Sequence, residues 1–147
     1  MLNIAKQEHA LAYALALWRV PGVGPKSFYQ LQKQFPNLAD LFHEKPEQLA
    51  LLGCPAKIIR GLTKPDWQGV ENDLFFHQQP GQAIIAINQA NYPNLLKEIH
   101  DAPPLLFVKG NVDILKDRQL AMVGSRQPTV SGQEIAHTFA TSLGQAG

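Results

Sequence analysis

The sequence changes character at Pro80-Gly81, and this change restricts the possible folds more than any other feature. Before it, apolar residues recur at the three- and four-residue spacing of helices. After it come short apolar and β-branched runs, such as residues 83–87, which are typical of strands. We therefore predict two domains, a helical module over residues 1–80 and an α/β part over residues 81–147.

Helical spacing and turn residues predict six helices in the first part. They cover residues 5–19, 27–35, 38–43, 46–52, 55–62 and 67–79, and Asp66 is the expected N-cap of the last. The apolar run 11–18 is too short to cross a bilayer, and Arg19 and Pro21 follow it where a signal peptide would have a cleavage site. We expect no membrane segment and a cytoplasmic location.

The second part alternates predicted strands and helices. Strands are expected at residues 83–87, 105–108 and 120–123, a short helix ends near Ile99, and a longer helix begins at Thr129 or Ser131. This alternation is typical of an α/β sheet, and the apolar runs are typical of parallel strands covered on both faces. Such a sheet cannot be finished by residue 147, so we expect the second domain to be incomplete.

Composition excludes several kinds of site. The net charge of +1 gives no general attraction to nucleic acid, so DNA binding would need a local site. One cysteine, Cys54, and five scattered histidines predict no metal site, and Cys54 is expected to be a small buried core residue. The chain lacks the G-x-G-x-x-G pattern of dinucleotide binding, so no cofactor is predicted.

A hairpin motif lies between the first two predicted helices, at residues 19–27. Gly22 and Gly24 permit a tight turn with positive φ that leaves backbone N–H groups open, and Lys26 adds charge at the start of the next helix. This resembles the helix-hairpin-helix motif, which holds DNA backbones without reading bases. A degraded copy lies at residues 51–57. The alternative is that the hairpin only packs two helices.

A second motif follows the third predicted strand. Gly124 lets a ligand approach the backbone, Ser125 offers a hydroxyl, and Arg126 offers a planar fork suited to phosphate. The following helix start adds open N–H groups, with Ser131 and Glu134 spaced as a capping box unless Thr129 is the cap. The alternative reading makes Gly124 a turn residue and Arg126 part of a surface ion pair.

Taken in order, the motifs resemble the DNA-processing protein A family (DprA/Smf). The residues that carry this resemblance are Tyr92-Pro93, Leu96, Ile99, Asp101, Pro103, Leu106, Gly110-Asn111, Ala121, Val123-Gly124-Ser125-Arg126, Thr129 and Gly132, after the hairpin of the helical module.

The resemblance implies an α + α/β fold: a helix-hairpin-helix (SAM-like) module, followed here by the truncated start of an extended Rossmann-like domain. It implies sequence-independent binding of single-stranded DNA without catalysis, help in loading RecA during natural transformation, and a homodimer of the full-length protein. It places Gly124, Ser125, Arg126 and Thr129 at the DNA, and extends a secondary DNA contact to Gly22, Gly24 and Lys26.

Two other functions compete with this one. A Rossmann-like enzyme that hydrolyses a nucleotide's glycosidic bond would need an acid near the glycine loop, and Glu134 is the only acid nearby, where capping would occupy it. A protein-interaction module would instead use the exposed surface of the helical part.

Overall fold

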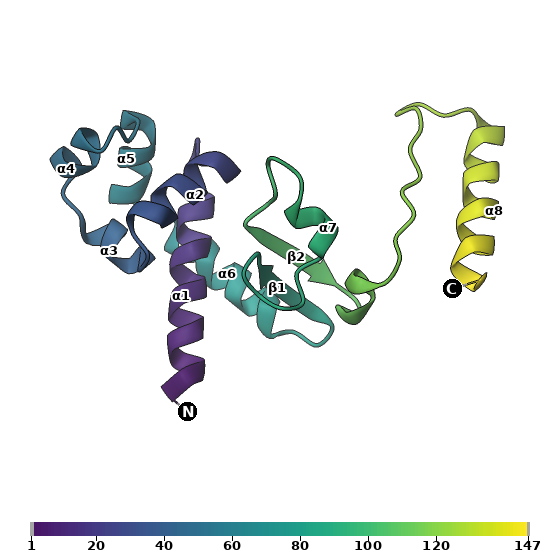
Figure 1. The fold of residues 1–147 in the computed structure, drawn as a ribbon, viewed down its shortest axis with the longest axis horizontal. Coiled ribbons are helices and arrows are strands. Elements are labelled where there is room, and N and C mark those ends of the chain that lie inside the picture. The colour runs from purple at the N-terminus through teal and green to yellow at the C-terminus, as the bar shows by residue number, and fades with distance from the viewer. Residues whose placement is uncertain (1, 147) are drawn as a thin grey trace. The chain divides into compact units, whose positions relative to one another are not determined.

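The computed structural model describes residues 2–146, with side chains described from residue 9 onward. The chain forms two compact units, one ending at Asp117 and one beginning at Arg118 (Figure 1). The first unit contains α1 Leu2–Arg19, α2 Pro25–Gln34, α3 Leu38–His43, α4 Pro46–Leu51, α5 Ala56–Thr63, α6 Trp67–Gln78, β1 Gln82–Ala86, α7 Asn94–Lys97, β2 Leu105–Lys109 and the short 3₁₀ helix η1 Asp113–Lys116, and the second contains α8 Val130–Ala146.

The six predicted helices of the first part are confirmed to within about a turn at each end. Asp66 caps α6 as expected, because its carboxylate accepts the N–H of Gly69 at 2.9 Å. Trp67 was expected to be buried with Val70, but its side chain is 41% exposed, since the first residue of α6 lies at the edge of the helix packing.

The helices enclose one apolar core. Leu17 of α1 and Val20 of the turn after it pack against buried residues of α2 to α5. These residues are Phe28, Leu31, Leu38, Leu41, Leu49, Ile58 and Leu62. Cys54 packs partly buried against this core, and burial raises the pKa of its thiol. A second cluster joins Leu15 and Ala16 of α1 and Val70 of α6 to Ile84 and Leu105 of the strands.

The two strands form an antiparallel pair, in which Ile84 lies opposite Phe107. The parallel arrangement expected from the sequence is therefore wrong for these strands. The connection over residues 87–104 contains only the four-residue helix α7, which is too short for the crossover that parallel neighbours require. The second cluster packs the sheet on α1 and α6. The predicted domain boundary at residues 80 and 81 stays a prediction.

The outer edge of β1 is closed by three local acceptors. The N–H of Ile84 donates to Nδ1 of His77 at 2.9 Å, and the N–H of Ala86 donates to Oε1 of Gln89 at 2.9 Å. The N–H of Gln82 donates to the carbonyl of Gln79 at 3.1 Å. These hydrogen bonds occupy the donors that a further strand would need on that side.

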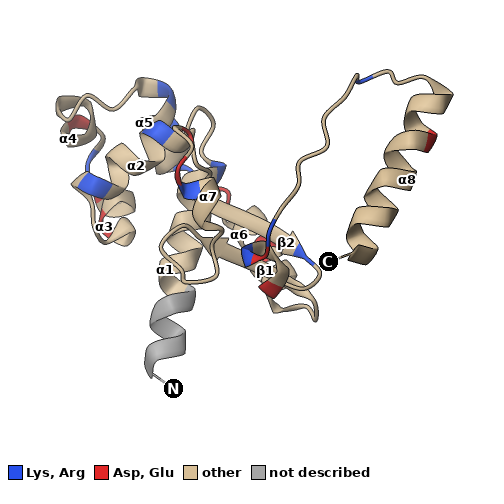
Figure 2. Ribbon diagram, turned by 45° about the vertical axis from the view of Figure 1, so that its right-hand side comes forward, with Lys and Arg blue, Asp and Glu red and all other residues tan. Residues whose placement is uncertain are grey.

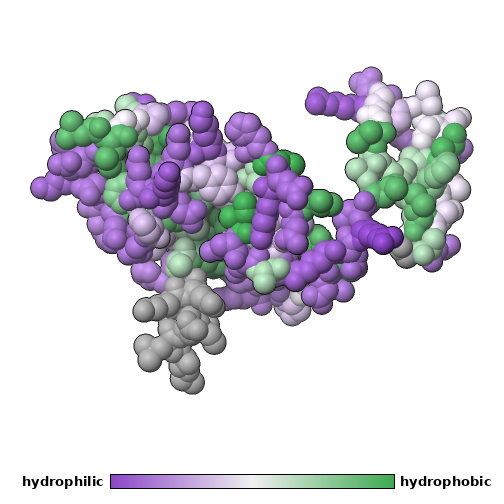
Figure 3. Space-filling model, in the orientation of Figure 1, coloured by the Kyte–Doolittle hydropathy of each residue, from purple (hydrophilic) through white to green (hydrophobic). Residues whose placement is uncertain are grey.

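The strand predicted at residues 120–123 does not form in the described residues. The segment is extended but has no neighbouring strand with which to pair, and an apolar run alone cannot satisfy its backbone hydrogen bonds. Helix α8 follows it, with Ile135, Phe139 and Leu143 exposed along its length, visible as green on α8 in Figure 3. Among the described residues, no helix combines the length and apolar character needed to span a membrane.

Candidate nucleic-acid interface

The two glycines of the turn between α1 and α2 have different backbone conformations. Gly22 has φ +96°, as predicted, whereas Gly24 has φ −117° and is extended. The N–H of Gly24 donates to Oγ of Ser27 at 3.0 Å, and its carbonyl accepts the N–H of Phe28 at 2.9 Å. Gly24 is therefore the N-cap of α2, and the prediction that it supplies positive φ and an open N–H is wrong.

The backbone N–H groups without a partner within α2 lie just after Gly24 in the chain. Pro25 has no N–H, so the first-turn groups of α2 without intrahelical partners are those of Lys26 and Ser27. The Lys26 side chain is exposed beside them. Arg19, the other cation of this motif, is engaged elsewhere: its guanidinium contacts Asp66 and Asp73, both at 2.8 Å.

The ion pair of Arg19 affects both partners. The hydrogen bond from Gly69 N–H, followed by that from Arg19, holds the pKa of the Asp66 carboxyl below its usual value. The hydrogen bond to Asp66 is the largest cause that raises the pKa of Arg19. Arg19 is therefore a structural cation that joins α1 to the start of α6.

The second hairpin, predicted as a degraded copy, packs against the first. Gly53 has φ +79°, and Pro55 precedes the first residue of α5. A Cβ added to Gly22 would lie 3.4 Å from Cδ of Lys57, so the aliphatic part of that side chain lies over the first turn. Lys57 is exposed and adds a second cation beside the turn between α1 and α2. Figure 2 shows basic residues on α5 in blue.

Sequence reasoning did not assign Lys57 to the site. The residue was recognised only as the end of the second motif, and nothing in its spacing from Gly22 indicates that the two turns meet. The structure therefore brings Lys57 over Gly22, while Gly24 serves as a cap and Lys26 lies in the first turn of α2.

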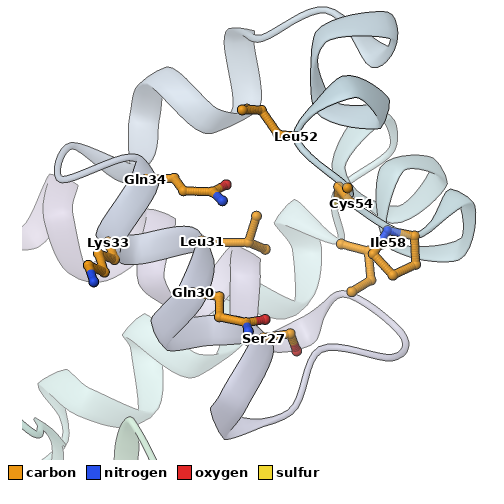
Figure 4. A pocket seen from close by; sticks show the side chains of 10 residues that line it. Ser27, Gln30, Leu31, Lys33, Gln34, Leu52, Cys54 and Ile58 are labelled. Carbon is orange, nitrogen blue, oxygen red and sulfur yellow. The ribbon is translucent and has the colours of Figure 1, made fainter.

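A groove runs between α2 and the turn that precedes α5. Its volume is about 590 Å³, and its lining residues are Ser27, Gln30, Leu31, Lys33, Gln34, Leu52, Gly53, Cys54, Pro55 and Ile58 (Figure 4). Buried Leu31 and Ile58 form an apolar floor, and the amides of Gln30 and Gln34 stand one helical turn apart on α2.

The predicted loop of the second unit is exposed. Oγ of Ser125 accepts the N–H of Gln127 at 3.2 Å and lies 3.2 Å from its carbonyl oxygen, so the hydroxyl closes a local turn. A Cβ added to Gly124 would meet no atom within 4 Å. Within the described residues 118–146, Arg126 has neither an ion pair nor a hydrogen-bond partner.

Thr129, rather than Ser131, caps α8. Its Oγ1 accepts the N–H of Gly132 at 3.1 Å, and its carbonyl accepts the N–H of Gln133 at 3.0 Å. The capping box of Ser131 and Glu134 is therefore wrong, because Glu134 lies more than one turn inside the helix. Its carboxylate is exposed rather than occupied as a cap.

The predicted site residues thus fall in two places. Gly22, Gly24 and Lys26 belong to the first unit, and the loop that contains Arg126 belongs to the second. Among the residues that the structure describes, no group of three or more His, Cys, Asp or Glu side chains could hold a metal ion.

Comparisons with known proteins agree with the motifs. Residues 83–147 match the model of the family described as DNA recombination-mediator protein A. The DNA processing protein DprA of Bacillus subtilis is 33% identical over 75 residues, which are 50% of this chain and 25% of that protein. Protein Smf of Synechocystis is 29% identical over 147 residues, covering 92% of this chain and 36% of the relative.

Protein Smf of Escherichia coli is 32% identical over 80 residues, or 54% of this chain and 21% of that protein. The chain therefore spans about a fifth to a third of the length of these relatives. The match of residues 83–147, which include the Gly-Ser-Arg loop, to the family model and the similarity to several DprA and Smf proteins support membership of the DprA/Smf family.

Proposed function

We propose that this chain is part of a non-catalytic protein of DNA recombination that binds single-stranded DNA through phosphate contacts, independently of base sequence. The observation that carries the proposal is Arg126, an exposed guanidinium without a partner among the described residues, next to the start of α8. The first-turn N–H groups of Val130 and Ser131 are open donors there, and the positive end of the helix dipole favours an anion.

The roles of the loop residues follow from their geometry. Arg126 supplies the charged, two-pronged contact to a phosphate. Ser125 and Thr129 act mainly by shaping the loop and capping α8, since both hydroxyls are engaged in local hydrogen bonds. Gly124 leaves the backbone uncovered for the strand to approach.

The helical module provides a second, smaller contact in this proposal. Lys26 stands at the start of α2, where two N–H groups are open, and Lys57 lies over Gly22 in the preceding turn. A phosphate bound there would contact residues from both hairpins. The proposal extends to help in loading RecA during natural transformation and to a homodimer of the longer family protein, as the family resemblance implies.

The test compares Arg126→Ala with Arg118→Ala, which removes the same charge from the same exposed segment. Loss of a charge-assisted contact costs about 1.5–3 kcal/mol, or roughly a tenfold to hundredfold loss in affinity for single strands. The loss should be similar for all base compositions, and the slope of log affinity against log salt should shrink by about 0.7 per lost phosphate contact. Equal affinity of wild type and a folded Arg126→Ala variant would contradict the proposal.

Because the Glu134 carboxylate is free, the hydrolase alternative has its own test. Nucleoside 5′-monophosphates are incubated with the chain and with Glu134→Gln, and release of free base is measured. We expect no release from either protein. Release that depends on Glu134 would assign the loop to an enzyme.

The RecA contact is tested by following RecA filament growth on single strands that are already coated with single-strand-binding protein. The longer family protein should accelerate filament growth, and its Arg126→Ala variant should do so less. An unchanged rate with the unsubstituted protein would remove RecA from the proposal.

A further inference from the structure

The groove between α2 and the turn before α5 is lined almost entirely by uncharged residues. Of its lining residues only Lys33 carries a charge, and no Asp or Glu of the described chain lines it. In Figure 4 Lys33 points away from the gap that Leu31 and Gln34 face. An occupant of the groove would therefore meet mainly apolar and uncharged polar groups.

The two ends of the groove differ from its interior. Ser27 lies at one end, next to Lys26 in the chain, and Ile58 lies next to Lys57. Lys33 marks the other end of α2. From Ser27 to Gln34 the helix rises about 10 Å. A neutral stretch with cations next to it in the chain resembles the alternation of uncharged bases and phosphates in a nucleic-acid strand.

The polar groups of the interior suit a base. Gln30 and Gln34 present amides that both donate and accept hydrogen bonds, above the apolar floor of Leu31 and Ile58. The volume of about 590 Å³ lies in the range of about 300–1,000 Å³ typical of small-molecule sites. Hydrogen bonds between these amides and the edge of a base would not select one base, because a glutamine amide can both donate and accept.

We propose that this groove receives at least one base of a bound single strand of DNA, with the flanking phosphates at Lys33 and at the Lys26–Lys57 end. The proposal rests on the proposed function, since it names where on the helical module a single strand lies. It adds base contacts to a module that would otherwise contact only phosphate.

Cys54 is a built-in reporter of occupancy. It is the only cysteine of the chain, it lines the groove, and it is partly buried. The rate of its reaction with a thiol reagent is measured for the full chain alone, with an oligonucleotide of thymidines, and with an abasic oligonucleotide of the same length and charge. Overall binding is measured separately by fluorescence anisotropy of the same oligonucleotides.

We expect the ordinary strand to slow the reaction of Cys54 by the factor 1 + [DNA]/Kd, or about tenfold at ten times Kd. At equal overall occupancy, the abasic strand should leave the rate nearly unchanged. The variant Gln34→Glu places a charge in the neutral interior and should abolish the protection. Its matched control is Gln48→Glu, the same charge change on exposed α4 outside the groove, which should retain the protection.

Each contrary outcome is distinct. Binding of both strands without protection of Cys54, or equal protection by both, overturns the groove proposal and leaves DNA binding by the chain intact. Retained protection in Gln34→Glu also overturns it. If neither strand binds the folded chain, the proposed function fails together with the groove. Protection by an apolar peptide but not by DNA would assign the groove to a protein partner instead.

Discussion

Lys57 lies over Gly22, with its Cδ 3.4 Å from the position that a Cβ on Gly22 would occupy. Gly22 also has φ +96°, whereas Gly24 is extended and has open space around it. We expect Gly22→Ala to destabilise the first unit by about 1–2 kcal/mol, the usual cost of a left-handed residue other than glycine. Gly24→Ala should change stability far less, because its backbone is accessible to any residue. Urea unfolding midpoints of the two variants check this difference, and equal midpoints would contradict it.

Gly61 of α5 packs closely against Val20 and Pro21 of the turn after α1. A Cβ there would lie 2.5 Å from Cγ1 of Val20. Gly61→Ala should therefore destabilise by about 1–3 kcal/mol through overpacking, more than the gain of up to about 1 kcal/mol from helix propensity. Adding Val20→Ala should relieve part of the clash despite its own cavity, and a double-mutant cycle in thermal unfolding measures that coupling. Gly144→Ala, where no atom lies within 4 Å, is the control.

Asp66 makes stability depend on pH. Its pKa is lowered in the folded protein, first by the hydrogen bond from Gly69 N–H and then by Arg19. A carboxyl whose folded pKa is depressed stabilises the fold above its unfolded pKa, and this contribution is lost as the pH falls through the folded value. Asp66→Asn should lower the melting temperature at neutral pH, and the difference from wild type should vanish in acid.

The control for this experiment is Glu134→Gln, an exposed carboxylate that lies more than one turn inside α8. It should follow the wild-type curve at every pH. Melting temperatures measured between neutral pH and about pH 2, below the usual range of Asp, provide the comparison. A constant difference between Asp66→Asn and wild type across this range would show that the capping geometry, and not the charge, carries the effect.

His77 closes the edge of β1 by accepting the N–H of buried Ile84. His77→Ala should leave that donor without a partner and destabilise the first unit by about 1–3 kcal/mol. Hydrogen exchange should accelerate at the Ile84 amide more than at amides that donate to β2. His100→Ala, an exposed histidine that pairs only with Asp101, should leave exchange in β1 unchanged. Uniform acceleration across the unit would instead indicate global loss of stability.

Local signals in the sequence were sufficient for the elements of the first unit. The spacing of Leu15 and Leu31 within their helices, and the capping side chain of Asp66, act over one or two turns of the same segment. Such interactions require no knowledge of distant parts of the chain. The loop of Arg126 was found for the same reason, because a glycine-containing turn before a helix is a contiguous motif.

Interactions between distant segments could not be predicted in this way. The antiparallel pairing of Ile84 with Phe107 depends on how residues 87–104 return, and the failure of residues 120–123 to form a strand depends on a missing neighbour. The contact of Lys57 with Gly22 joins residues that are 35 positions apart in the sequence (57 − 22). No periodicity in the sequence indicates such a contact.

The sequence by itself thus determined the helices, the two turns between them and the resemblance to DprA and Smf proteins, because these reside in short contiguous patterns. Only the tertiary structure decided that Gly24 is a cap, that Arg19 is held by Asp66 and Asp73, and that a neutral groove opens beside α2. The physical reason is that a side chain's availability depends on which other groups compete for it. That competition is settled by packing between segments that are remote along the chain.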